Sequence, residues 1–242
     1  MAHISRHELK ADQLRTTFEE FEEYVKTHYK EIATVLGIVV VVAGLAGSLK
    51  VYQARREADA NELLGRALTT FRAYVGAPPQ GGVPPNFQSF PTAGEKYKKA
   101  QDQFQEVVQK FSRVPEPKPV AIARYHVGLC QALLGNHDAA IQTLEEASRE
   151  SDRNIAALAQ FALAGELVKI GKVDDAAKIY QDLAARPTST VPEATAKLAL
   201  AEAYRASQPA KARLIYQELE KKFGSDVTIA QVLKDQMASL PK

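Results

Sequence analysis

The sequence predicts an all-α protein in which a charged N-terminal helix and a single transmembrane helix precede a helical solenoid. Three observations support this prediction: an uncharged run of 18 residues near the N-terminus, apolar residues at helical spacing, and an internal repeat of 36 residues in the C-terminal half. Repeats of this length are typical of stacked helix pairs, because no single unit can bury its apolar face alone.

Composition and charge exclude several classes of function. The 242 residues include 31 Lys and Arg and 29 Asp and Glu, a formal net charge of +2. This near-balance provides no broad basic surface, so we expect no nucleic-acid partner. One cysteine and five scattered histidines provide no cluster at zinc-site spacing, so we expect no metal. The mean hydropathy of −0.25 is that of an ordinary soluble protein, but this average hides one strongly apolar segment.

The first segment, residues 1–31, is predicted to be a charged helix with one apolar stripe. The stripe residues recur at alternating spacings of four and three, which places them on one helical face: Leu14, Phe18, Phe21, Val25, His28 and Ile32. This pattern fits a solvated helix with one apolar side. It also fits a short coiled coil or a docking helix, and both interpretations stay open because the stripe spans barely three heptads.

An apolar run follows at once, and we expect residues 32–51 to form a transmembrane helix. The 18 residues from Ile32 to Leu49 carry no charge. At about 1.5 Å per residue they span about 27 Å, close to the hydrocarbon thickness of a bilayer. Tyr29 and Tyr52 flank the run, and amphipathic rings at such positions favour the membrane interface.

Two features of this segment bear on its topology. The small residues of Gly44-Leu45-Ala46 resemble a signal-cleavage site, but the long helix of mixed charge ahead of the run favours a retained anchor. Within about 20 residues of the span there are three basic residues on the N-terminal side and four on the C-terminal side. Charge bias therefore leaves both orientations open.

Residues 52–113 are predicted to form a membrane-proximal pair of helices separated by a loop. The first helix continues to residue 76. Five prolines and a Gly-Gly pair then predict an extended or mobile loop at 77–92. The second helix covers about 94–113 and ends before a second cluster of prolines.

Residues 119–224 contain the repeat, and residues 225–242 are predicted to form a capping helix. Three kinds of residue recur every 36 positions, namely small turn residues, small helix residues and large apolar residues: Gly135, Gly171 and Ser207; Ala140, Ala176 and Ala212; Leu144, Tyr180 and Tyr216. Each unit therefore consists of a first helix, a short turn and a second helix. The small residue lets two helices approach closely, and the large residue one turn later fills the groove between them.

The sequence contains no catalytic motif. Phosphate-binding glycine loops, zinc-protease motifs and nucleophile elbows are all missing. His126 and Cys130 share a predicted helical face, but a small core cysteine beside a half-exposed histidine explains this pair better than a nucleophile does. We therefore expect a protein that is not an enzyme and that has no cofactor and no small-molecule substrate.

The repeat residues resemble the tetratricopeptide repeat, whose second helix carries Ala and then an aromatic residue or Leu four positions later. Val127-Gly128 is similar to the Leu-Gly pair of the family's first helix, although the large aromatic residue that often opens this helix is missing. The resemblance implies that Gly128 packs against a neighbouring helix and that the first helices line a concave groove. Placing the register on Gly128 assigns six residues to that groove: Tyr125, Leu129, Phe161, Val168, Lys197 and Tyr204.

This predicted groove is mainly apolar, which suits an extended hydrophobic segment or a partner helix better than a charged tail. The alternative is that several of these residues belong to the core between repeats. In either case the expected partners are proteins.

The order of the parts resembles the YfgM-like family, bacterial inner-membrane proteins associated with the Sec translocon. The segment Asp12–Ala60 carries the likeness, and the repeats add generic support. The proline-rich stretch at 77–92 departs from the family pattern. The resemblance implies a single-pass inner-membrane protein with a cytoplasmic N-terminus and periplasmic repeats. Its implied partners are translocon subunits, periplasmic chaperones and unfolded secreted chains.

Two alternatives share this architecture. One is a tetratricopeptide adaptor for envelope assembly or cell division. The other is a soluble periplasmic adaptor from which the apolar segment has been cleaved.

Overall fold

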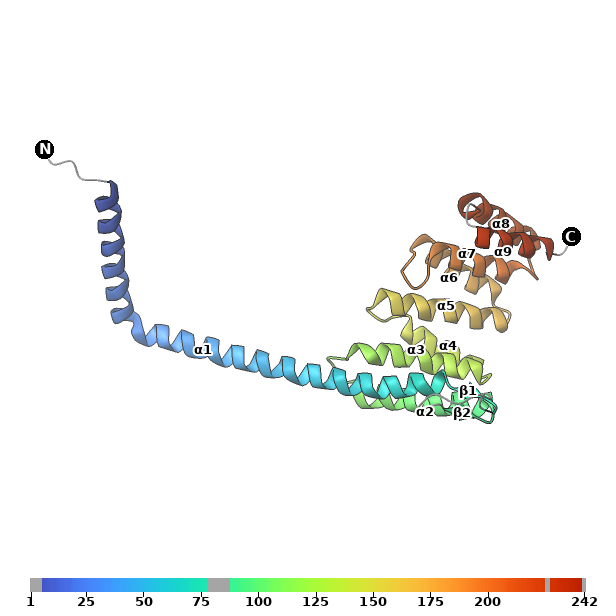
Figure 1. Cartoon of the computed structure of the whole chain (residues 1–242), viewed down its shortest axis with the longest axis horizontal. Coiled ribbons are helices and arrows are strands. Elements are labelled where there is room, and N and C mark those ends of the chain that lie inside the picture. Colours follow the sequence, from blue (N-terminus) through green and yellow to red (C-terminus); the bar gives the residue numbers. More distant parts are fainter. Residues whose placement is uncertain (1–5, 78–87, 225–226, 241–242) are drawn as a thin grey trace. The chain divides into compact units, whose positions relative to one another are not determined.

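The computed structural model describes residues 6–77, 88–224 and 227–240, and nearly all of its regular structure is helical (Figure 1). It confirms the predicted all-α class, with one apolar N-terminal helix followed by an array of helix pairs. The chain divides into two compact units, 1–55 and 56–242. Each unit is described separately below.

Helix α1 (Arg6–Phe71) forms the first unit and continues into the second. Its one non-helical residue is His28, with φ −109° and ψ 17°. Within the described residues, Ala33–Phe71 is long and apolar enough to cross a membrane. The large apolar side chains from Val35 to Tyr52 are more than half exposed, 69% for Val40 and 65% for Leu45, so no other part of the described chain covers them. The side chains of Leu14, Phe18, Phe21 and Ile32 in the predicted stripe lie outside the described residues.

The second unit begins with the last turns of α1, which pack against α2 (Ala93–Phe111) and α3 (Lys118–Leu133). The three helices share one apolar cluster that includes Ala60, Leu64, Ala67, Phe104, Val107, Val120 and Val127. Arg56 holds the end of α2 in place by donating hydrogen bonds to the carbonyl oxygens of Phe111 (3.0 Å), Arg113 (3.2 Å) and Pro115 (3.3 Å).

Helix α1 ends at Phe71, so the prediction that it continues to residue 76 is wrong. Strand β1 (Tyr74–Val75) pairs in parallel with β2 (Ser89–Phe90). Gly76 directly follows β1 and has φ +97°, a conformation that glycine adopts readily, and its amide donates to Phe90 O at 2.9 Å. Residues 78–87 of the predicted loop lie outside the described residues.

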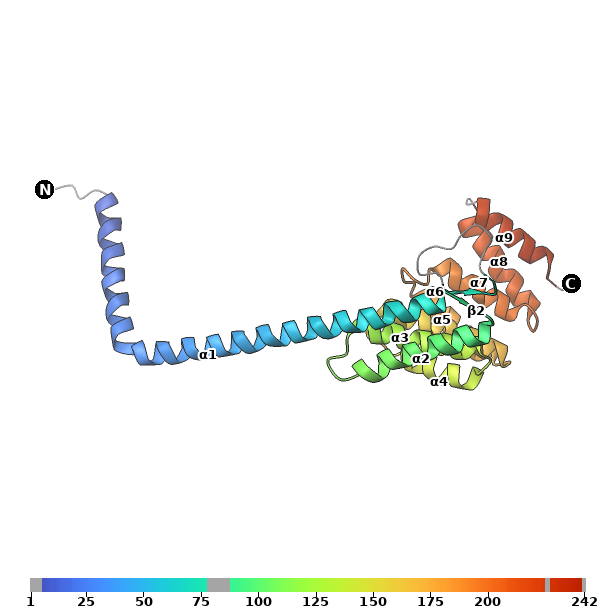
Figure 2. The same cartoon turned by 60° about the horizontal axis from the view of Figure 1, so that its bottom comes forward.

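The remaining helices stack in sequence order on this first group, as both views show (Figures 1 and 2). They are α4 (His137–Ala147), α5 (Arg153–Lys169), α6 (Val173–Ala185), α7 (Glu193–Tyr204), α8 (Pro209–Phe223) and α9 (Val227–Ala238). A second apolar cluster runs continuously from α4 to α9. Each helix contacts the next along the chain, as expected of a solenoid whose repeats touch only their neighbours.

Two of the turns inside the repeats share one geometry. Gly135 and Gly171, 36 residues apart, have φ +80° and +81° and end the first helix of their repeats. In each turn the amide after the glycine bonds back to the helix: Asn136 N to Gln131 O (2.9 Å) and Lys172 N to Leu167 O (2.8 Å). This pattern satisfies helix-end carbonyls and sends the chain directly into the second helix.

Candidate protein-binding groove

The residues predicted to pack the repeats are in the core. Ala140, Leu144, Ala176, Ala212 and Tyr216 are fully buried, and Tyr180 is nearly so. Gly128 faces Leu144 so closely that a Cβ on the glycine would lie 2.7 Å from Leu144 Cγ. Helices α3 and α4 therefore approach at a point where any larger residue would force a shift.

A groove of about 580 Å³ lies between α6, α7 and α8. Its lining is largely apolar and comes from all three helices: Ala184, Ala185, Leu200, Tyr204, Leu214 and Ile215. Leu214 is 66% exposed, which makes it the most accessible large apolar residue in this groove. A largely apolar groove of this kind can hold the side chains of a peptide or a partner helix.

The structure places the six predicted groove residues in two different settings. Lys197 and Tyr204 line the groove between α6, α7 and α8, and Tyr204 is buried at 6% exposure. Tyr125, Phe161 and Val168 are partly buried and pack against the α4–α9 cluster, and Leu129 is half-buried on α3. Phe161 also makes an edge contact with Tyr180, with ring centroids 5.3 Å apart.

Sequence reasoning missed the contribution of the second helices to the groove. The register assigned the groove to first helices alone, whereas α6 and α8 supply more than half of the lining. The sequence feature that could have revealed this contribution is Leu214. It is a large apolar residue that lies off the buried face of α8, which Ala212 and Tyr216 mark.

One end of the groove carries a network of alternating charges. Lys197 Nζ lies 2.5 Å from Glu218 Oε1 and 3.1 Å from Glu193 Oε1, and Lys222 Nζ lies 2.6 Å from Glu193 Oε2. The hydrogen bond to Glu218, assisted by Glu193, raises the pKa of Lys197. Lys222 and Lys197 hold the pKa of Glu193 below its usual range. The charges at this end are mutually compensated, so the groove's recognition surface is its apolar part.

A cation covers the aromatic residue in the middle of the groove. Lys211 Nζ lies 5.1 Å from the centroid of the Tyr204 ring. This distance is within the range of a cation–π contact.

His126 and Cys130 are core residues and do not form a reactive pair. Cys130 is fully buried, and burial raises the pKa of its thiol to about 12. Burial lowers the pKa of His126, whose Nδ1 lies 2.8 Å from Ile122 O and whose ring stacks on Phe104 with centroids 4.8 Å apart. A neutral thiol beside a neutral imidazole lacks the thiolate that nucleophilic catalysis requires.

Within the described part of the chain, no three His, Cys, Asp or Glu side chains gather in a way that could hold a metal ion. The expectations that the protein has no metal, no cofactor and no catalytic activity stay predictions.

The model of the Tetratricopeptide repeat family matches residues 93–155 and 161–227, which together make up more than half of the chain. No curated protein and no solved structure matches the chain. The match begins at α2, ahead of the segment where the three in-phase copies are evident in the sequence. Repeats of this kind indicate a role as a protein-interaction adaptor. The chain therefore belongs to the tetratricopeptide repeat family.

Proposed function

We propose that the protein is a membrane-anchored protein-interaction adaptor that works beside the Sec translocon and links secreted chains to periplasmic chaperones. The observation that carries the proposal is the exposed apolar stretch of α1, which lies in the same helix as residues that pack into the repeat unit. Contiguous apolar surface of this extent is a hallmark of membrane or partner contact.

The mechanism follows from tethering. A groove that binds apolar segments weakly becomes effective when an anchor holds it where such segments emerge, because tethering raises the local concentration of the binder. The largely apolar lining around Leu200, Leu214 and Ile215 suits unfolded chains, whose apolar residues are exposed before folding.

The proposed topology has the N-terminus in the bacterial cytoplasm, residues 32–51 across the inner membrane with Tyr29 and Tyr52 at its two interfaces, and the repeats in the periplasm. The resemblance of Asp12–Ala60 to the YfgM-like family supports this orientation and the link to the translocon. Both tyrosines are exposed on α1, as residues at a membrane interface would be.

Three measurements test this proposal. Carbonate extraction of membranes should leave the full chain in the pellet, and its release into the supernatant would favour the cleaved, soluble adaptor. Alkaline phosphatase fused after Leu240 should be active if the repeats are periplasmic, and an inactive fusion that is expressed normally would overturn the orientation. Co-purification with division or envelope-assembly proteins in place of translocon subunits would favour the alternative adaptor.

A further inference from the structure

A charged residue lies in the last turn of the second helix, or within three residues after it, in each of three successive repeats. These residues are Glu150, Arg186 and Lys222, and 36 residues separate each from the next. Because the repeats stack in phase, the three side chains have equivalent places in the fold.

In the first and third of these repeats, the charge is neutralised by the first helix of the same repeat. Glu150 pairs with Arg124 of α3, and Arg124 also pairs with Glu116 at 3.1 Å. Lys222 Nζ lies 2.6 and 2.8 Å from the two carboxylate oxygens of Glu193 on α7. Both repeats therefore contain their own counter-charge.

The middle repeat lacks this counter-charge. Ala157 on α5 occupies the place of Glu193, and Gln160 occupies the place of Arg124, each 36 residues away. Among the described residues, Arg186 pairs with Asp182 of its own helix and forms no ion pair with α5. No carboxylate from the first helix reaches this guanidinium.

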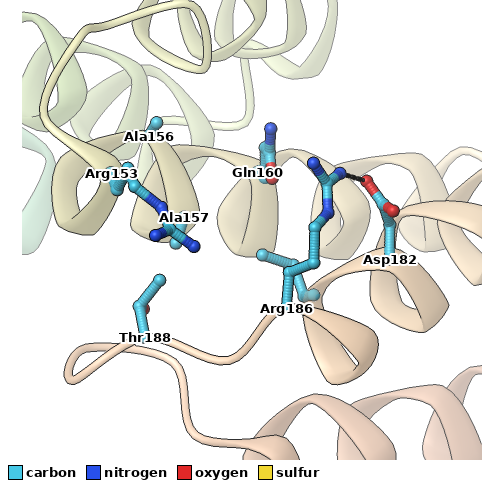
Figure 3. Close-up of a pocket in the computed structure, with 8 residues that line it drawn as sticks. Arg153, Ala156, Ala157, Gln160, Asp182, Arg186 and Thr188 are labelled. Carbon is cyan, nitrogen blue, oxygen red and sulfur yellow. Dashed lines mark hydrogen bonds and ion pairs between the residues drawn. The ribbon is translucent and has the colours of Figure 1, made fainter.

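A cavity of about 130 Å³ lies where that carboxylate is missing (Figure 3). Arg153 at the start of α5 and Arg186 at the end of α6 both line it, together with Gln160 and Thr188. Within the described parts of the chain, Arg153 forms neither an ion pair nor a side-chain hydrogen bond. The cavity therefore has two guanidinium groups against one carboxylate, that of Asp182.

The rim of this cavity is held in place before any ligand binds. Ser189 Oγ donates to Asn154 Oδ1 at 2.9 Å, and Thr190 Oγ1 donates to Asn154 O at 2.9 Å. Val191 N donates to Thr188 Oγ1 at 3.0 Å. The first two bonds tie the loop between α6 and α7 to the start of α5, so the backbone around the cavity needs little ordering on binding.

We propose that this cavity binds an acidic side chain of a partner protein, whose carboxylate takes the place that Glu193 has in the next repeat. A guanidinium presents paired N–H donors that match a carboxylate. With about 130 Å³, the cavity is large enough to admit the side chain of an Asp or Glu. It shares no lining residue with the apolar groove, and its charge selects an acidic segment.

The test uses the full chain in a nonionic detergent and a fluorescent hexaglutamate amide as the probe, followed by anisotropy at low salt. We expect saturable binding that a hexaglutamine amide does not reproduce. Replacing both arginines (Arg153→Gln with Arg186→Gln) should weaken the binding about tenfold or more, because it removes charge-assisted hydrogen bonds. The matched control, Arg213→Gln, removes an exposed arginine outside the cavity and should leave the affinity unchanged.

A second variant supplies the missing charge from within the chain. Ala157→Glu should pair with Arg186, as Glu193 pairs with Lys222, and should displace the probe while the helical circular dichroism signal is retained. The proposal is overturned if hexaglutamate does not bind, if the double variant binds as well as the wild type, or if Arg213→Gln loses as much affinity. It is also overturned if inorganic phosphate binds and the peptide does not. The assay depends on neither the membrane anchor nor the translocon. A negative result would therefore overturn this proposal and leave the proposed function unaffected.

Discussion

His137 Nδ1 lies 2.7 Å from Glu166 Oε2, which joins the first residue of α4 to the last turns of α5. The Glu166 side chain is only 6% exposed, and its other oxygen accepts a hydrogen bond from Lys169 Nζ at 2.6 Å. Burial alone would raise the pKa of Glu166, but the hydrogen bonds from Lys169 and His137 outweigh burial and lower it. The carboxylate is therefore ionised in the folded protein, and it fastens two successive helices.

The first prediction concerns stability in acid. A carboxyl group whose pKa is lowered by folding adds stability that is fully present above its ordinary pKa and is lost as the pH falls through the lowered value. Glu166→Gln should lower the free energy of unfolding at pH 7 by about 1–3 kcal/mol. It should also flatten the acid limb of the pH profile measured by urea unfolding. Glu145→Gln, which removes an exposed acid, is the control, and an equal effect from both variants would refute this role.

The second prediction concerns the contact between Gly128 and Leu144. Gly128→Ala places a Cβ 2.7 Å from Leu144 Cγ, so it should destabilise the protein by about 1–3 kcal/mol through overpacking. Gly165→Ala is the matched control, because its Cβ would meet its nearest atom, Tyr180 Oη, at an ordinary 3.7 Å. The control should be neutral or stabilise by about 0.5–1 kcal/mol, as alanine does in a helix. Thermal unfolding that ranks the two variants in the opposite order would contradict the packing described.

The third prediction concerns Cys130. Its thiol is fully buried and has a pKa of about 12, so almost none of it is thiolate at pH 8. A disulfide reagent such as DTNB should not label the native chain and should label it at once in denaturant. In denaturant, the label should appear as fast as the chain unfolds, and the rate of unfolding is measured separately by circular dichroism. Rapid labelling of the native protein would show that the α1–α3 cluster is open in solution.

The fourth prediction concerns Arg56, whose guanidinium donates to three carbonyl oxygens at and just after the end of α2. Arg56→Met keeps much of the apolar stem but removes the donors. It should destabilise the unit by about 1–2 kcal/mol and speed amide hydrogen exchange near Phe111. The neighbouring Arg55 is exposed, so Arg55→Met should change neither quantity. If exchange near Phe111 is equally slow in both variants, Arg56 does not hold the end of α2.

The repeat core could be predicted from the sequence because its determinants recur with a fixed spacing. The packing of three helix pairs can be predicted from the spacing of Ala140, Ala176 and Ala212 alone, whatever surrounds them in the fold. The end of α1 could not be predicted in the same way. The strand that follows Phe71 pairs with residues more than a dozen positions later, and helical periodicity carries no information about such a partner.

The groove was predictable only in part, for a related reason. The register assigns Lys197 and Tyr204 to a groove, and both line the groove between α6, α7 and α8, but the exposure of Leu214 depends on how α8 packs against α7. Tyr125 and Phe161 occupy the position of Lys197 in earlier repeats, and there they pack against the core. Equivalent positions in a repeat therefore share their backbone setting but not their exposure.

The most direct test of the adaptor account is photo-crosslinking in native membranes. A photoreactive amino acid would replace Leu214 in the groove, Ile38 in the apolar stretch, or Arg213 as the adjacent control outside the groove. We predict adducts of Leu214 with secreted chains or a periplasmic chaperone, adducts of Ile38 with translocon subunits, and none above background at Arg213. If Leu214 yields no more adduct than Arg213, or yields adducts with cytoplasmic proteins alone, the account of a tethered periplasmic adaptor is contradicted.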